Sequence, residues 1–381
     1  MFCAQSPKPR VHPLRHCVNL RRRRGRERVS FMPSTSPLQA LRRAFHRAIH
    51  GKCRARAPAF FALDRADLLA TLADELDACT YAPSKGRAFA ITDPKPRLIY
   101  ALPFRDRVVQ HLLMESMMPA LERWFAPQSY ACRVGKGSHR CLERAIELTR
   151  QKRFVLRIDI RKFFPSIDHA ILRALLEPFT APRDRWLRDA FLDQQVECER
   201  VAWYFPGDTL FTPFERPHGL PIGSLTSQIW ANAFLTPIDH LIASKLRIGT
   251  FVRYCDDVLV FDDDRGRLQD ALSAIDERAS SLRLRLHAGK TRLHRSTDPV
   301  GFLGFVLRQR PDAGVSVRLQ SDNIQRFRAR MQETLTLYDA GAIEAGDVVC
   351  RVRAWLAHAQ HGDTRALCKQ ELARLAWVRS T

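Results

Sequence analysis

Two short apolar runs next to acidic residues constrain the fold more than any other feature of the chain. Residues 154–160 (FVLRIDI) place Asp159 at the end of one run, and residues 251–261 (FVRYCDDVLVF) place Asp256 and Asp257 between two more. Short apolar runs bounded by turn residues are typical of buried strands. Together with the helical stretches around them they predict the order β-α-β-β-α-β of a ferredoxin-like split βαβ unit, and therefore an α+β fold.

The rest of the chain predicts helices and one hairpin. Residues 87–102 read as two strands around the turn signal Asp93-Pro94-Lys95-Pro96, whereas residues 192–218 predict an insertion or hairpin of undefined shape. Helical spacing of apolar residues predicts helices over 37–80, about 105–125, about 138–151, from 168 onward, 224–246, about 265–285 and a C-terminal region, with a strand pair around 302–307. In the C-terminal region one apolar stripe predicts packing only: Ile324, Phe327, Met331, Leu335 and Tyr338.

The charge balance predicts a polyanionic partner. Against 40 Asp and Glu stand 62 Lys and Arg, which gives a formal net charge of +22. Such an excess repels itself in a compact protein, and nucleic acid or an anionic membrane is the usual reason to carry it. We expect nucleic acid and no membrane partner, because no stretch approaches the ~20 consecutive apolar residues of a spanning helix. The 10 cysteines show no zinc-site spacing, which favours a reducing compartment.

The three aspartates suit metal-assisted phosphoryl transfer. This chemistry uses two divalent ions ~3.5–4 Å apart, and hard ions such as Mg²⁺ prefer oxygen ligands. Asp159, Asp256 and Asp257 supply such ligands from two places in the sequence. The alternative is ordinary turn chemistry, because Asp tolerates tight turns and hydrogen-bonds to its own backbone.

Around these acids the sequence resembles reverse transcriptases in seven ordered blocks. The blocks are KPRLIYALPFRDRVVQHLL (95–113), SYACRVGKGSHRCLERAIEL (129–148), RIDIRKFFPSIDH (157–169), HGLPIGSLTSQIWANAFLTPIDH (218–240), the YxDD signature at 254–257, HAGKTRL (287–293) and GFLGF (301–305). The resemblance covers about residues 85–381 and implies an RNA-directed DNA polymerase, a nucleotidyltransferase with a right-hand fold. It implies fingers at 37–152, a ferredoxin-like palm at 153–305 and a helical thumb at 306–381. Residues 1–36 are expected to be a basic disordered arm or an over-extended start.

The resemblance also implies roles for individual residues. Asp159, Asp256 and Asp257 are expected to hold two Mg²⁺ ions, which Mn²⁺ can replace, with the backbone of Ile160 beside them. Phe164 matches the position whose side chain excludes a ribose 2′-OH. The alternative role for Phe164 is packing in the core, although Phe163 fits the core better. Nucleotide contacts are expected from Lys95, Arg97, Phe164, Ile222, Gly223 and Lys290, and nucleic-acid contacts from Arg107, Tyr254 and Gly304.

Three of these assignments have plain structural alternatives. Lys95 and Arg97 equally suit solvated charges on a hairpin, with Arg97 the stronger candidate for phosphate contact. Arg107 suits a structural pair with Asp106 or a neighbour. Lys290, which matches a proton-donor position for pyrophosphate, equally suits an exposed lysine near a helix end. The partners implied are an RNA template, a DNA or RNA primer and dNTPs.

Within the family, the chain looks most like the enzymes of diversity-generating retroelements. The segments that carry this likeness are PFRDRVV (103–109), PIGSLTSQ (221–228) and WLAHAQHGDTRAL (355–367), with aliphatic Ile222 where many relatives carry a polar side chain. The likeness implies error-prone copying at adenine, a small basic helical accessory protein and a cytoplasmic enzyme encoded by a prokaryote or phage. The alternatives are a retron, intron-derived or phage-defence reverse transcriptase, and a catalytically silent RNA-binding protein on the same palm fold.

Overall fold

The computed structural model of the chain describes residues 36–51, 56–92, 96–194, 199, 201–312 and 314–377. The chain divides into residues 1–36, of which Ser36 alone is described, and a unit of residues 37–381 that carries every element below. The predicted arm at 1–36 therefore lies outside the described residues except for Ser36. None of the helices in these ranges combines the length and apolar character that a bilayer crossing needs.

A four-stranded antiparallel sheet forms the centre of this unit. Its strands are β3 (Phe154–Ile158), β4 (Phe251–Tyr254), β5 (Asp257–Asp262) and β6 (Arg292–Arg295), in the order β4-β5-β3-β6. The first and third strands of the unit are central and the second and fourth lie at the edges, as in the predicted split βαβ arrangement. Ile158 pairs with Val258, so the register brings Asp159 beside the β4–β5 turn.

Both faces of this sheet are covered by other elements. Successive side chains of a strand point to opposite sides and therefore enter two different cores. Leu156 and Ile158 join one core with α10 (Leu225–His240) and α11 (Arg265–Ser281). Val155, which alternates with them, joins a second core. On that side lie α5 (Ser138–Gln151) and a three-stranded sheet of β7 (Val300–Phe302), β8 (Phe305–Gln309) and β9 (Val315–Leu319).

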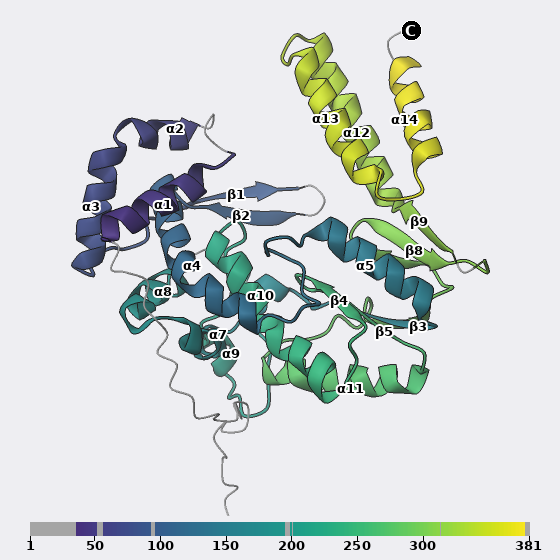
Figure 1. Ribbon diagram of the computed structural model, residues 1–381, viewed down its shortest axis with the longest axis horizontal. Helices are drawn as coiled ribbons and strands as arrows, with labels where there is room; N and C mark the ends of the chain where they lie inside the picture. Colours follow the sequence, from purple (N-terminus) through teal and green to yellow (C-terminus); the bar gives the residue numbers. More distant parts are fainter. Residues whose placement is uncertain are drawn as a thin grey trace, which may run out of the picture. The chain divides into compact units, whose positions relative to one another are not determined.

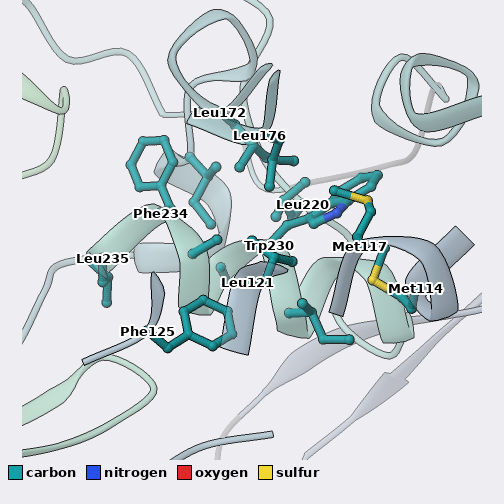
Figure 2. Close-up of a cluster of buried hydrophobic side chains, with 14 of the residues drawn as sticks. Met114, Met117, Leu121, Phe125, Leu172, Leu176, Leu220, Trp230, Phe234 and Leu235 are labelled. Carbon is teal, nitrogen blue, oxygen red and sulfur yellow. The ribbon is translucent and has the colours of Figure 1, made fainter. Parts of the chain in front are cut away.

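The first core continues into a helical layer. Figure 2 shows Met114, Met117 and Leu121 of α4 (Phe104–Trp124) gathered with Trp230 of α10 and with Leu172 and Leu176 of α7 (His169–Leu176). Asp168 caps α7 by accepting a hydrogen bond from the Ile171 amide at 2.9 Å. α1 (Pro37–Ile49) packs on α4. The other helices are α2 (Arg56–Leu63), α3 (Arg65–Asp77), α6 (Phe163–Ser166), α8 (Arg185–Leu192) and α9 (Thr212–Glu215). Short 3-10 turns lie at Glu177–Phe179 and Pro182–Asp184, and a π-helical turn lies at Leu241–Lys245.

A hairpin of β1 (Arg87–Ile91) and β2 (Arg97–Ala101) is tied to the loop before α10 (Figure 1). The Tyr100 amide donates to the Ile222 carbonyl at 2.8 Å. Gly223 follows with φ +114, and a Cβ there would lie 3.0 Å from the Tyr100 carbonyl oxygen. Only glycine fits this close approach without strain, which explains how the loop can run against the strand.

Three helices end the described chain: α12 (Ser321–Asp339), α13 (Ala345–Ala359) and α14 (Arg365–Trp377) (Figure 1). The predicted stripe on α12 packs as expected, with Phe327, Met331 and Leu335 buried and Phe327 stacked on Trp355 of α13. The turn before α14 docks on β9, because the Asp363 amide donates to the Val317 carbonyl at 2.7 Å.

The structure confirms the hairpin, the strands around the aspartates and the main helices, and differs in two places. β6 and β9 have no counterpart among the predicted elements, and β9 keeps the chain in a sheet up to Leu319, beyond the predicted start of the thumb at 306. Within 192–218 the described residues hold α9 and no strand, with 195–198 and 200 outside the description. β6 depends on a partner distant in sequence, because it pairs with β3, whereas β9 pairs with its neighbour β8.

Candidate active site

The three predicted carboxylates meet in one cavity. Asp159, Asp256 and Asp257 all line a cavity of about 720 Å³. Asp159 reaches it from the end of β3, and the other two reach it from the β4–β5 turn, in which Tyr254 pairs with Asp257 and Cys255 takes the left-handed φ of +53. The antiparallel pairing of β3 with β5 brings these two places together.

Crowding of the acids perturbs their protonation. Burial, and then the negative charges of Asp257 and Asp159, raise the pKa of Asp256 from 3.8 to about 6. Burial also raises the pKa of Asp257, against the opposing influence of Arg157. Asp256 and Asp257 are thus less easily ionised than in water, which is the electrostatic setting that a bound cation relieves.

A lysine neutralises the third acid. The Lys290 ammonium lies 3.2 Å from both carboxylate oxygens of Asp159. The backbone of Lys290 lies in a tight turn next to Asp159. The His287 amide donates to the Asp159 carbonyl at 2.8 Å, and the Lys290 backbone amide donates to the His287 carbonyl at 3.0 Å. The exposed-lysine alternative is therefore incomplete, because Lys290 faces the cavity and contacts Asp159.

A buried ion pair lies next to the β4–β5 turn and supports it. Arg253 on β4 donates to both carboxylate oxygens of Asp239 on α10, at 2.7 and 2.5 Å, with side-chain exposures of 1% and 0%. The same guanidinium donates to the Asn232 side chain at 2.7 Å and to the Cys255 carbonyl at 3.2 Å. The turn that carries Asp256 is thus fixed to α10 by a hydrogen-bonded network.

Several predicted nucleotide contacts line the same cavity. Arg97, Phe164 and Ile222 do so, as does Ile160 beside Asp159. Phe164 is half-buried and meets Phe163 edge to face at 5.6 Å between ring centroids, while Phe163 is almost fully buried. This division agrees with the prediction that Phe163 belongs to the core.

The remaining predicted residues lie elsewhere. Lys95 is outside the described residues. Gly223 and Arg107 line a separate cavity of about 320 Å³. Tyr254 packs on the α5 side of the sheet, and Gly304 sits in the β7–β8 turn, where a Cβ would be 3.2 Å from the His358 ring. Asp106 accepts from the Tyr81 hydroxyl and the Ser84 amide, so the described structure does not pair it with Arg107.

Three cations of the cavity were not predicted from the sequence. Arg157, Arg161 and Lys162 all line it, and Arg157 lies 3.6 Å from Asp257 in an ion pair. The signal for Arg157 was present, because residues two apart on a strand share a face and Arg157 precedes Asp159 by two. Arg161 and Lys162 lie beyond the end of β3, where no strand alternation predicts which way their side chains point.

The donor set fits hard divalent cations. Among the described residues no group of three His, Cys, Asp or Glu side chains is close enough to hold a metal ion by itself. Mg²⁺ does not require one, because it usually takes one or two carboxylates and completes its shell with water and substrate phosphates. Burial and the neighbouring negative charges, which together raise the pKa of Asp256, would both be offset by a bound cation. Asp159 and Asp256 would hold such an ion.

Comparison with known proteins agrees with this geometry. A search of curated proteins returned no match to the chain. The family model described as reverse transcriptase (RNA-dependent DNA polymerase) matches residues 89–307, which span the β1–β2 hairpin, the central sheet and both sources of carboxylates. This is more than half of the chain, and the family implies a polymerase palm fold, an RNA template, a primer and dNTP substrates, and divalent metal ions. The chain therefore belongs to the reverse transcriptase (RNA-dependent DNA polymerase) family.

Proposed function

We propose that the protein copies an RNA template into cDNA by two-metal phosphoryl transfer at the Asp159–Asp256–Asp257 cavity. One observation carries the proposal: carboxylates almost 100 residues apart in sequence line one cavity together with cations that suit a triphosphate. Asp159 and Asp256 are the main ligands, Asp257 lies beside them against Arg157, and the Ile160 backbone borders the site. Two bound Mg²⁺ ions, or Mn²⁺ in their place, would activate the primer hydroxyl and neutralise the leaving pyrophosphate.

The cations of the cavity then bind the triphosphate. Arg97 is exposed on β2 and lines the cavity. Its positive charge acts to lower the pKa of Asp256, against the larger effect of burial. A guanidinium binds phosphate oxygens in a bidentate fork, which an ammonium lacks. Lys290, already in the cavity, supplies a second charge, and we assign a third to Lys95, which lies outside the described residues.

We assign the surrounding parts by their elements. Residues 37–152 form the fingers, 153–305 the palm, and the C-terminal helices from Ser321 the thumb. Arg107 lines the smaller cavity together with Gly223. Nucleic acid is the ligand we assign to that cavity, with Tyr254 and Gly304 as further contacts.

Primer extension tests the proposal directly. A homopolymeric RNA template with an annealed DNA primer, dTTP and Mg²⁺ should give products that lengthen with time, and omission of Mg²⁺ should stop them. The rival function, an RNA-binding protein without catalysis, predicts binding of the template and primer but no extension under any divalent ion. That outcome with folded protein would overturn the proposal.

Phe164 is expected to select the sugar. Its half-buried ring lines the cavity next to the residues that would hold the triphosphate. Phe164→Val should raise the use of ribonucleotides relative to deoxynucleotides by about one to two orders of magnitude, because a pocket discriminates by roughly that factor when it fits or excludes one small group. Single-nucleotide incorporation with dTTP and UTP measures the ratio. Phe179→Val is the matched control outside the cavity, and an unchanged ratio in Phe164→Val would remove the assignment.

We further propose that the enzyme belongs to a diversity-generating retroelement. The support is the aliphatic Ile222 in the nucleotide cavity, with the segments 103–109, 221–228 and 355–367. A small basic helical accessory protein and a cytoplasmic site in a prokaryote or phage-infected cell belong to this proposal. A retron, intron-derived or phage-defence enzyme would share the chemistry, and a neighbouring template-repeat and variable-repeat pair separates the cases.

Ile222 is expected to relax the checking of the nascent base pair. Ile222→Gln should lower misincorporation opposite template adenine by about fivefold, because a polar contact restores about 1 kcal/mol or more of discrimination. Sequencing of cDNA made from a defined template gives the error spectrum. Ile222→Leu keeps the side chain apolar and should leave the spectrum unchanged, and equal spectra for all three proteins would exclude Ile222 from fidelity.

A further inference from the structure

A short segment outside the predicted motifs reaches the active-site cavity at Glu199. Glu199 lines this cavity, and its carboxylate forms an ion pair at 2.6 Å with Lys162, which also lines it. Lys162 takes the left-handed φ of +47, a conformation that a residue other than glycine keeps only with support from its surroundings. The segment therefore contacts the loop that directly follows Asp159.

Trp203 in this segment joins two arginines. Its ring lies 6.0 Å from the Arg161 guanidinium carbon and 5.6 Å from that of Arg285, both within cation–π range. Arg285 also donates to the Tyr204 carbonyl at 3.0 Å, and its own carbonyl accepts from the Arg161 amide at 2.9 Å. Trp203 thus packs on two chain segments that are already hydrogen-bonded to each other.

Arg161 is left available for a ligand. It lines the cavity, is exposed, and has no ion pair with any carboxylate in the described part of the chain. The Arg161 guanidinium carbon lies over the Trp203 ring at the outer limit of a cation–π contact. Such a contact restricts where the group lies without occupying its N–H groups, which can still donate to a phosphate.

We propose that Trp203 is a positioning residue that holds Arg161 at the cavity, where Arg161 binds the phosphates of the incoming dNTP. The inference rests on the proposed function, because it assumes that the triphosphate occupies this cavity. It adds a residue from within 192–218, the region predicted as an insertion or hairpin, to the nucleotide site. The ligand chemistry is the polyphosphate, so base and sugar identity should not alter the effect.

The test is a double-mutant cycle on primer extension by the full chain. Arg161→Ala should raise the KM for dTTP by about tenfold, as expected for loss of a charged hydrogen bond to phosphate. Trp203→Ala should raise the same KM by about threefold, the size of one exposed cation–π contact, with kcat and template–primer affinity changed far less. Adding Trp203→Ala to Arg161→Ala should give no further increase, because the tryptophan acts through the arginine.

Two further variants separate positioning from general damage to the fold. Trp203→Phe keeps a ring and should recover most of the wild-type KM, whereas Phe214→Ala removes a 70% exposed ring of the same insertion and should have no effect. The inhibition constant of inorganic triphosphate should rise in Arg161→Ala and Trp203→Ala by the same factors as the KM.

The outcomes distinguish this inference from the proposed function. An active wild type whose KM for dTTP is unchanged by Trp203→Ala or Arg161→Ala, or in which the two effects multiply in the double variant, overturns the inference alone. So does an unchanged inhibition constant for triphosphate. A folded wild type that never extends a primer overturns the proposed function together with the inference.

Discussion

Asp256→Ala is expected to lower primer extension by about a thousandfold or more while template binding remains. Asp256 lies at the point where the β4–β5 turn meets Asp159, so its loss removes an anionic metal ligand. Metal stabilisation of the transition state amounts to several kcal/mol, and each 1.36 kcal/mol is about a factor of ten in rate. Binding of RNA rests instead on distributed Lys and Arg contacts, which weaken with salt. Extension rates measure catalysis, and filter-binding affinities at two salt concentrations measure template binding.

The controls for this variant address charge and folding. Asp276→Ala removes one negative charge from the exposed face of α11 and should leave extension unchanged. Asp256→Asn keeps the shape and should be at least as stable as wild type at pH 7 without divalent ions. The reason is the raised pKa, about 6 in the folded state against 3.8, which means that ionisation of Asp256 opposes folding increasingly as pH rises from about 4 to 6. If Asp256→Ala extended primers at the wild-type rate, the assignment of Asp256 to the active site would be wrong.

Arg253→Met is expected to lower the free energy of unfolding by about 3–5 kcal/mol, the cost of leaving one partner of a buried ion pair without the other. Asp239, with an exposure of 0%, would lose its buried partner, and Asn232 and the Cys255 carbonyl would lose a donor. Urea unfolding followed by circular dichroism measures the loss, which is a large fraction of the stability of an ordinary domain.

Two comparisons show whether burial is the cause. The double variant Arg253→Met with Asp239→Leu removes both charges and should recover a large part of the stability. Arg310 and Asp363 form a pair with exposures of 48% and 51%, so Arg310→Met should cost about 1 kcal/mol or less. If Arg253→Met unfolds at the same urea concentration as wild type, the buried network does not hold the catalytic turn.

The sequence predicted the catalytic sheet well because its signals are local. An apolar run with Asp159 at its end and a turn with Asp256 and Asp257 between apolar runs each specify a strand without reference to the rest of the chain. The family order of motifs then implied the convergence that β3 and β5 produce.

The sequence did not predict parts that depend on distant partners. β6 (RLHR) is polar and short, and it becomes a strand because β3 offers an unpaired edge. The contact of Trp203 with Arg161 and Arg285 joins three places that no spacing rule connects. The packing of Tyr254 on the α5 side of the sheet likewise depends on α5, which lies more than 100 residues earlier in the sequence.

The ammonium of Lys290 already occupies both oxygens of Asp159. A divalent ion that approaches this acid must therefore exchange with a tethered monovalent one, and the free protein stores its own counter-ion at the catalytic centre. Metal loading would release the lysine at the moment when a polyphosphate arrives and needs a positive charge.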